Sequence, residues 1–207
     1  MNIRLNITIQ PNNDIVNYAI KKSKMLSKFG KHFFVLDGKN YFPHISIYPP
    51  EFPEQGLDKI ISEVIKISKS VKPFKLTFKD ILYEEGFLGI NFKNDKKVKE
   101  LHLMVLESIN PLREDLMRDK YKDKKFLGKQ TKIAKGYIIK YGYPRVLDLY
   151  IPHLTLIRFD SLKSSDEVIS KIKWDKNEIE VSKLGIFEMG DNGTCIKLIK
   201  EIFLNNE

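Results

Sequence analysis

Apolar and polar residues alternate over several short stretches of the chain, which is the pattern of β-strands with one buried face. The first such stretch covers residues 3–9. Two more, over residues 74–78 and 88–92, flank a turn at residues 84–86 and predict a hairpin. A short apolar run over residues 33–36 indicates a further strand. We therefore expect an antiparallel sheet, in which strands close in sequence pair through tight turns.

Other segments carry apolar residues at helical spacing, with capping or stop residues near their ends. These segments cover residues 14–29, 57–70, 95–109 and 164–173. Gly30 is suited to end the first helix, and Asn110-Pro111 restarts a helical turn after the third. Ser164 or Ser165 is the expected cap of the last helix. Helices interspersed with antiparallel strands predict an α+β fold.

The most informative stretch is the pentad Pro43-His44-Ile45-Ser46-Ile47, which recurs as Pro152-His153-Leu154-Thr155-Leu156. Side chains alternate between the two faces of a strand, so each pentad buries aliphatic residues and presents an imidazole and a hydroxyl opposite them. One such match is expected by chance in roughly one of forty chains of this composition, and two in only a few of ten thousand. A lone copy is typical of a hydrogen-bonded histidine at a strand edge, whereas the duplication indicates a functional pair.

The two pentads lie at matching places in a wider internal repeat. Each is followed by a helical stretch, an alternating strand, a turn and a returning strand. The last turn glycine, Gly86 or Gly193, comes 42 residues after His44 and 40 residues after His153. We therefore expect one domain over residues 1–207, with two pseudo-symmetric lobes of antiparallel sheet, helices packed outside and a central groove between the sheets. The lobes are expected at approximately residues 10–93 and 94–203, with the first strand pairing across.

Composition adds the expected environment and partners. The chain is 42% hydrophobic, yet no apolar run approaches the roughly 20 residues that span a bilayer, so we expect a soluble cytoplasmic protein without membrane contact. The single Cys195 excludes an internal disulfide. A net charge of +9 suits an RNA terminus or a small nucleotide, although lysine-rich surfaces also arise without nucleic-acid binding. No obligatory protein partner is indicated, and we expect a monomer.

The doubled motif resembles the two-histidine phosphoesterase superfamily, which includes bacterial 2′-5′ RNA ligases and 2′,3′-cyclic nucleotide phosphodiesterases. The resemblance rests on residues 43–47 and 152–158, and the order of elements extends it over almost the whole chain. It implies a catalytic tetrad, which is His44, Ser46, His153 and Thr155. Arg158 matches the arginine that follows the second motif in the ligase branch. The first pentad is followed by Tyr48-Pro49-Pro50, whereas the ligase branch has a small turn with glycine there. The resemblance therefore does not decide to which branch of the superfamily the chain is most similar.

Residues near the pentads are candidates to bind substrate. Arg158 would point away from the groove in a regular strand, so its role requires a β-bulge or the end of the strand. By strand parity, Phe42 and Tyr48 share a face with the first pentad's imidazole and hydroxyl. Tyr143 belongs to a group of tyrosines before the second pentad, where stacking on a base and burial under the loop are both open.

Two further features have less specific interpretations. Residues 120–135 are basic with interspersed aromatic residues, which suits either a loop that follows a phosphate backbone or a solvated linker. His102 falls within the apolar helix of residues 95–109, where we expect a packing role. His32, beside Gly30, is expected at the surface.

With this resemblance, the tetrad predicts general acid–base chemistry on a phosphodiester. One imidazole would remove a proton from the attacking water, and the other would deliver a proton to the departing ribose oxygen. Ser46 and Thr155 would stabilise charge on the nonbridging phosphate oxygens. No carboxylate cluster accompanies the pentads and no glycine-rich phosphate loop is present, so we expect neither a metal ion nor a cofactor.

The sequence therefore predicts a metal-independent phosphoesterase acting on RNA ends or small nucleotides. It would hydrolyse a 2′,3′-cyclic phosphate, or cleave or form a 2′-5′ phosphodiester bond. Alternatives are a phosphodiesterase for 2′-5′ oligoadenylates or cyclic signalling nucleotides, and an RNA-binding module without catalysis. The pattern does not assign which histidine is the base, the physiological substrate, or whether ligation occurs.

Overall fold

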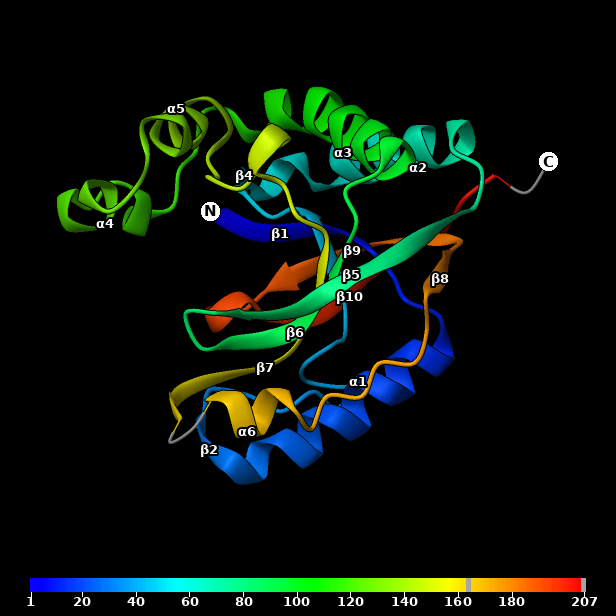
Figure 1. Ribbon diagram of the computed structural model, residues 1–207. Helices are drawn as coiled ribbons and strands as arrows, with labels where there is room; N and C mark the ends of the chain where they lie inside the picture. The colour runs from blue at the N-terminus through cyan, green and yellow to red at the C-terminus, as the bar shows by residue number, and fades with distance from the viewer. Residues whose placement is uncertain (163–164, 206–207) are drawn as a thin grey trace.

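The computed structural model describes residues 1–162 and 165–205, and its strands lie in a layer between two groups of helices (Figure 1). The strands are β1 (Asn2–Ile9), β2 (Gly30–His32), β3 (Ile45–Tyr48), β4 (Glu51–Pro53), β5 (Phe74–Glu84), β6 (Phe87–Phe92), β7 (His153–Leu162), β8 (Glu178–Val181), β9 (Lys183–Met189) and β10 (Cys195–Phe203). The helices are α1 (Asn13–Leu26), α2 (Leu57–Ser70), α3 (Lys96–Ile109), α4 (Lys124–Gly128), α5 (Lys132–Tyr141) and α6 (Ser165–Ile169). The predicted α+β class is confirmed.

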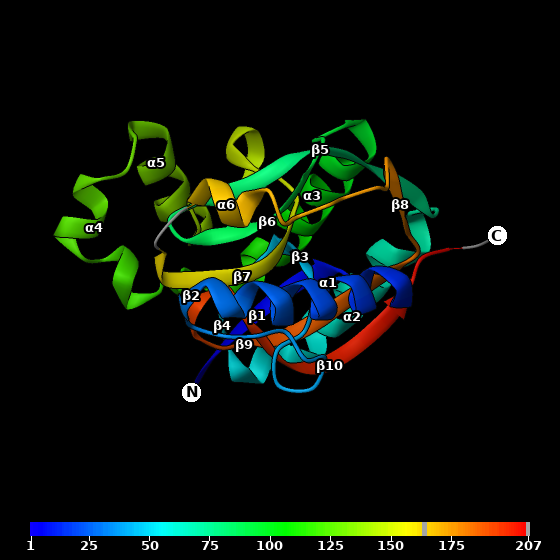
Figure 2. The ribbon, with the colours of Figure 1, turned by 60° about the horizontal axis from the view of Figure 1, so that its bottom comes forward.

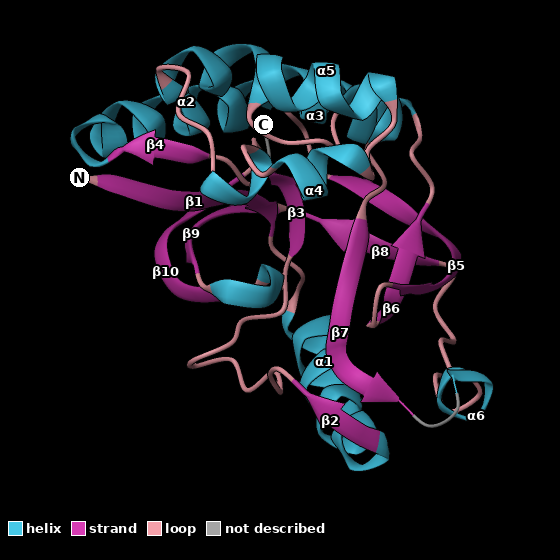
Figure 3. Cartoon of the chain, turned by 90° about the vertical axis from the view of Figure 1, so that its left-hand side faces the viewer, coloured by secondary structure: helices cyan, strands magenta, loops and turns pink. Residues whose placement is uncertain are grey.

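The two pentad strands meet in the middle of one antiparallel sheet, whose order is β10-β9-β1-β3-β7-β6-β5-β8. The short strands β4 and β2 pair with β1 and β7, beside that path. Figure 3 shows β3 and β7 side by side, with β1, β9 and β10 beyond β3 and β6, β5 and β8 beyond β7. The β3–β7 register is marked by Ile45 opposite Leu154. Two four-stranded halves are thus joined along the strands that carry the histidines.

Helices cover both sides of this layer. Helices α2 and α3 lie on one side, and α1 and α6 lie on the other (Figure 1). Figure 2 brings α1 to the front, where it runs across the strands and buries Ile15, Ala19 and Leu26. One continuous core joins these helices to strands of both halves. The apolar stripes of the helices and the aliphatic faces of the pentads therefore pack into a single hydrophobic interior.

The halves of the sheet are not the two halves of the sequence. The hairpin β5–β6 follows the first pentad but pairs with β7, whereas the hairpin β9–β10 follows the second pentad but pairs with β1. Because the hairpins cross over, the expected boundaries at residues 10–93 and 94–203 do not separate the two halves. The first strand does pair across, since β1 lies between β3 and β9.

Most expected elements lie where their patterns place them. Helix α2 covers the whole predicted segment 57–70, and Asp95 caps α3 by accepting a hydrogen bond from the backbone N–H of Val98. The strand expected at residues 33–36 is wrong, because the pairing with β7 is made by β2, earlier in the chain. Helix α6 begins at Ser165, and the expected cap at Ser164 lies outside the described residues.

Within the described chain, none of the helices combines the length and the apolar character that crossing a bilayer requires.

Candidate active site

Both pentad strands contain the same irregularity. In β3, Ser46 pairs with Thr8 and Tyr48 pairs with Ile7, so Ile47 is an extra residue without a partner on β1. In β7, Thr155 pairs with Gly89 and Ile157 pairs with Leu88, so Leu156 is the extra residue there. Each strand therefore bulges directly after its hydroxyl residue, and side-chain parity reverses from that point onward.

The polar faces of the two pentads line one cavity of about 620 Å³, as the pattern predicts. The tetrad residues His44, Ser46, His153 and Thr155 all contribute to its wall. The aliphatic residues between them are buried on the opposite face. Because Ile45 pairs with Leu154 in an antiparallel register, each histidine lies beside the hydroxyl residue of the other strand. The tetrad is therefore interleaved between the two strands.

The two imidazole rings are held in the same way. Nδ1 of His44 lies 2.8 Å from the carbonyl oxygen of Phe42, and Nδ1 of His153 lies 2.8 Å from that of Ile151. A carbonyl oxygen only accepts, so Nδ1 of each ring carries the hydrogen and donates it. The neutral rings therefore keep the Nε2 lone pair for a ligand or a proton.

Burial favours the neutral form of both rings. Burial lowers the pKa of His44 to about 4, a hydrogen bond to Phe42 acts in the opposite direction, and His153 lowers the pKa further. The pKa of His153 is also lowered, by burial and by Arg145, against the opposing effects of the Ile151 carbonyl and Glu84. A nearby anion would favour the protonated forms of both rings.

Ser46 is oriented by a residue that the sequence analysis did not single out. The side-chain amide of Asn6 on β1 donates to Ser46 Oγ at 2.8 Å, and Asn6 is fully buried. Because the hydroxyl oxygen accepts this bond, its own hydrogen is left to donate toward the cavity. The alternation of β1 shows only that Asn6 lies on the polar face, which could equally meet solvent.

Arg158 reaches the cavity because of the bulge in β7. Its Nη1 donates to Asn192 Oδ1 at 2.9 Å, and its guanidinium lies over the rings of Phe87 at 4.4 Å and Phe33 at 5.1 Å. The β-bulge that Arg158 needs in order to reach the groove is thus confirmed. A role for Arg158 in substrate binding stays a prediction.

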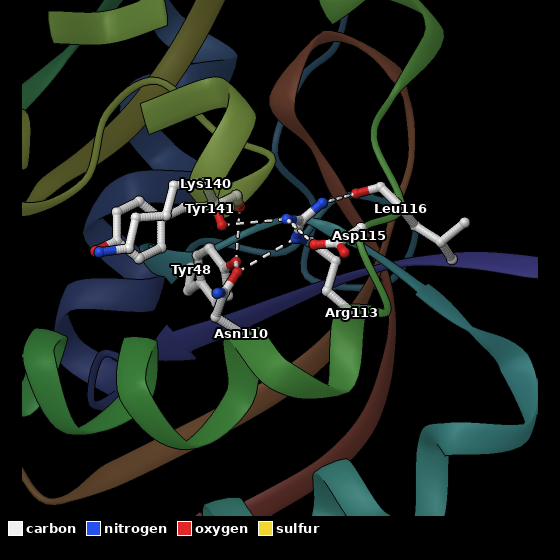
Figure 4. A network of polar contacts seen from close by, with 7 residues as sticks. All are labelled: Tyr48, Asn110, Arg113, Asp115, Leu116, Lys140 and Tyr141. Carbon is white, nitrogen blue, oxygen red and sulfur yellow. Dashed lines mark hydrogen bonds and ion pairs between the residues drawn. The ribbon is translucent and has the colours of Figure 1, made fainter. Parts of the chain in front are cut away.

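The matching bulge in β3 removes Tyr48 from the cavity, and the parity argument is wrong for this residue. Tyr48 is fully buried, and its hydroxyl lies 2.7 Å from both Asn110 Oδ1 and the Tyr141 carbonyl oxygen. Figure 4 shows this contact within a network around Arg113, which also donates to the Lys140 carbonyl at 3.2 Å. Tyr48 therefore ties the strand of the first pentad to the end of α5.

Phe42 is the second aromatic residue that parity misplaces. It precedes the start of β3, so the strand alternation does not extend to it. Its ring packs on Phe187 at 5.4 Å between centroids, and within the described chain it is not part of the cavity wall. Tyr143 does line the cavity and meets Tyr121 edge-on at 6.4 Å.

The basic segment of residues 120–135 forms one wall of the cavity, and the solvated-linker interpretation is wrong. It contributes Lys120, Tyr121, Phe126 and Gln130 to the wall, and Arg118 lies just before it. Helices α4 and α5 of this region extend to one end of the molecule (Figure 1), and α4 lies in front of β3 and β7 in Figure 3. Arg118 and Arg145 are wall residues that the sequence analysis did not identify.

The two predicted turns also meet at the cavity. Glu84 and Glu85 come from the β5–β6 turn, and Asp191 and Asn192 come from the turn before β10. Glu84 pairs with Arg145 at 2.8 Å. In residues 1–162 and 165–205, no three His, Cys, Asp or Glu side chains are grouped to hold a metal ion, and the metal-independent chemistry stays a prediction.

Comparisons with known proteins agree with this geometry. A family model described as the 2′-5′ RNA ligase superfamily matches residues 31–193. No curated protein matches the chain. A crystal structure titled phosphoesterase aligns over 100% of both chains with a TM-score of 0.62 and 12% identity.

Two further solved structures share the fold. TT0787 of Thermus thermophilus has a TM-score of 0.60 and 12% identity, over 99% of this chain and 100% of that one. E. coli LigT complexed with 3′-AMP has a TM-score of 0.58 and 12% identity, over 98% of both chains. At this level of identity, the structural matches establish the fold alone.

Proposed function

Because the chain belongs to the 2′-5′ RNA ligase superfamily, we propose that it is a phosphoesterase that acts on RNA ends or small nucleotides. Its reaction is hydrolysis of a 2′,3′-cyclic phosphate, or cleavage or formation of a 2′-5′ phosphodiester bond. The observation that carries this proposal is the pair of identically anchored imidazoles, His44 and His153, on one cavity.

The proton transfers of hydrolysis follow from this pair. A neutral imidazole accepts a proton from water through Nε2 as the water oxygen attacks phosphorus. The other imidazole, protonated when the anionic substrate is bound, gives its Nε2 proton to the ribose oxygen as that oxygen leaves. The product is a phosphomonoester and a free ribose hydroxyl, and the two rings exchange roles in the reverse direction.

The hydroxyl residues serve the nonbridging oxygens in this mechanism. Ser46 accepts a hydrogen bond from Asn6 and donates its own hydrogen to one oxygen, and Thr155 donates to another. A positioned donor of this kind stabilises the charge that develops on a phosphoryl group by about 3 kcal/mol. The tetrad thus combines proton transfer with charge stabilisation.

The first prediction tests this reaction with purified protein in EDTA. The wild type is expected to convert 2′,3′-cyclic AMP or a 2′-5′ dinucleotide to a product with a phosphomonoester or a free hydroxyl, detected by chromatography. His44→Ala and His153→Ala should each lower the turnover rate by about 100-fold or more, because each removes one proton transfer.

A matched control is His32→Ala, which removes another histidine whose Nδ1 contacts a carbonyl oxygen two residues earlier, away from the cavity. Its turnover should stay within about twofold of the wild type, because His32 is half-buried outside the cavity and takes no part in the proton transfers. Undiminished turnover in either pentad variant would contradict the acid–base assignment. A wild type that is inert on every such substrate yet binds RNA with a steep salt dependence would identify a binding module instead.

A further inference from the structure

One wall of the cavity carries cationic side chains that lack acidic partners. We call Arg118, Lys120 and Arg158 the basic cluster; all three line the cavity of the tetrad. Across the described residues, none of the three has a carboxylate oxygen within 4.0 Å, whereas the neighbouring Arg145 is paired with Glu84. The cluster therefore holds positive charge that the protein does not neutralise by direct contact.

These charges lie close enough to act on one another. The pKa of Lys120 is lowered to about 8 by burial, by Arg118, by Arg4 behind the wall and by Arg158, with only Glu85 opposing. Grouping cations in one place costs free energy unless an anion neutralises them. Such a group is expected where an anionic ligand binds.

Unsatisfied donors lie in the same region. Within the described chain, Nε of Arg158 and both Nε and Nη2 of Arg4 are buried without a hydrogen-bond acceptor. Arg4 has only a long contact with Asp191, at 3.6 Å. These donors are shielded from solvent and Arg4 is not among the cavity-lining residues, so they add positive charge near the basic cluster rather than direct contacts for a ligand.

The tetrad does not need the basic cluster for its own phosphate, because two imidazoles and two hydroxyls already surround that position. The cavity of about 620 Å³ is far larger than one phosphate group and falls in the range of roughly 300–1,000 Å³ that is typical of small-molecule sites. Phe126 and Tyr143 supply aromatic surface in the same space. The cavity therefore has room for a nucleoside with a second anionic group.

We propose that the basic cluster is a second phosphate site, which binds the phosphate on the 5′ side of the nucleotide whose 2′,3′-phosphate is held by the tetrad. In RNA the 5′ oxygen carries the next phosphate, so it is the nearest second anion. The preferred substrate is then an RNA end or a nucleotide that carries a 5′-phosphate. This inference rests on the proposed function only for the identity of the first phosphate.

The second prediction is that the basic cluster binds a second phosphate, and binding measurements without turnover test it first. In calorimetric titrations at 0.1 M salt, the wild type should bind adenosine 3′,5′-bisphosphate about tenfold more tightly than 3′-AMP, because charge-assisted contacts to a second phosphate add to the first. Lys120→Met and Arg118→Met should each reduce this preference to about twofold. Both keep an apolar stem, and their thermal unfolding should match the wild type.

Lys122→Met is the control, because Lys122 lies on the same turn but pairs with Asp119 at 2.9 Å and faces solvent. It should keep the tenfold preference. Equal affinity of the wild type for the two ligands, or a preference that survives both Lys120→Met and Arg118→Met, would overturn the second site.

Measurements of turnover then distinguish a failure of the second phosphate site from a failure of the proposed reaction. A 2′,3′-cyclic nucleotide with a 5′-phosphate should have the higher kcat/KM, and Lys120→Met should remove the advantage mainly through KM. If the wild type turns over neither substrate, the proposed reaction fails, while the binding titrations still decide the second site. If both substrates are turned over equally well, the second site is rejected and the reaction stands.

Discussion

The imidazole of each pentad is fixed by the carbonyl oxygen two residues before it, an interaction between near neighbours in the chain. Such a local anchor sets the tautomer and the direction of the ring without help from distant elements. The same hydrogen bond occurs in both pentads, so the repeated sequence itself determines the orientation of both rings.

His102 uses its two ring nitrogens for a structural purpose. Nδ1 lies 3.2 Å from the Ile47 carbonyl oxygen, Nε2 accepts from the backbone N–H of Leu147 at 2.9 Å, and the ring stacks on Tyr150. A ring that both donates and accepts in this way must be neutral. Burial lowers the pKa of His102 to about 4 despite the hydrogen bond to Ile47.

The third prediction follows from this lowered pKa. The unfolded chain takes up a proton on His102 near pH 6.5, before the folded protein does, so stability is complete above that pH and falls as the pH drops toward 4. His102 is expected to contribute a loss of about 3 kcal/mol over this range. Urea unfolding at pH 7.5, 5.5 and 4.5 measures the free energy of unfolding.

His102→Gln is the comparison, because glutamine is polar but does not titrate. It should be less stable than the wild type at pH 7.5 and lose less stability between pH 7.5 and 4.5. His44 and His153 contribute to the acid sensitivity of both proteins equally, so the difference isolates His102. Identical slopes for the two proteins would show that His102 does not become charged on unfolding.

Among individual residues, the sequence identifies the tetrad, Arg158 and Tyr143 but not the whole of the cavity wall. The tetrad stands out because a rare pattern is written twice. Arg118 and Arg145 lie in irregular segments where no periodicity indicates the direction of a side chain. Asn6 has a periodic position, but strand alternation does not say which neighbour lies opposite it.

Among the elements, the paired bulges decide which side chains enter the cavity. One unpaired residue in each strand brings Arg158 in and turns Tyr48 away. Alternation predicts faces correctly up to the bulge and incorrectly after it, because an unpaired residue leaves no mark in the hydrophobic pattern. The bulge in β7 was expected only because Arg158 could not otherwise reach the groove. The first pentad has no such residue after it, so nothing in the sequence indicated the bulge in β3.

Gly89 explains how β6 accommodates the bulge. It pairs with Thr155, and a Cβ atom on it would lie 2.2 Å from the Leu154 carbonyl oxygen and 3.0 Å from the Thr155 Cα. The backbone of β7 would have to move to make room for such a Cβ atom. Glycine is therefore required where the two strands approach most closely.

The fourth prediction is that Gly89→Ala lowers the free energy of unfolding by more than about 2 kcal/mol and reduces turnover. The control is Gly136→Ala within α5, where a Cβ would meet no atom within 4 Å. Alanine there should be neutral or stabilising by up to about 1 kcal/mol. Denaturant unfolding of both variants measures the difference, and equal stabilities would contradict the steric requirement at Gly89.

Helices α4 and α5 of the basic segment have capping residues that the sequence analysis overlooked because of the many charged residues around them. Asp123 caps α4 by accepting from the backbone N–H of Phe126 at 2.7 Å, and Thr131 caps α5 by accepting from that of Ala134 at 3.1 Å. Both are standard capping residues at the expected spacing. The many lysines of this segment favoured a loop, although lysine is compatible with helix.

For the whole molecule, the crossing of the hairpins makes each half of the sheet dependent on both halves of the sequence. Strand β1 needs β9, and strand β6 needs β7. Local patterns predicted most strands and the hairpin β5–β6, but not which strand each hairpin joins, because an alternating strand looks the same whichever edge it joins. The repeat in the sequence therefore suggested lobes that the chain does not build separately.

The fifth prediction is that a fragment of residues 1–93 does not fold alone, although it contains the first pentad. It lacks β9 and β7, so β1 and β6 would each expose an apolar edge with unpaired backbone groups. Circular dichroism and thermal denaturation should show no cooperative transition, in contrast to the full chain. A cooperative transition in the fragment would indicate an independent lobe.

The pairing of the bulges leaves one position where the two copies differ in charge. Pro49 occupies in the first strand the place that Arg158 occupies in the second, and both line the cavity. A strictly duplicated binding site would accept a ligand in either of two reversed poses with equal energy. A cation at this position in one copy alone lifts that degeneracy, so Arg158 favours one of the two poses for any anionic ligand that the cavity binds.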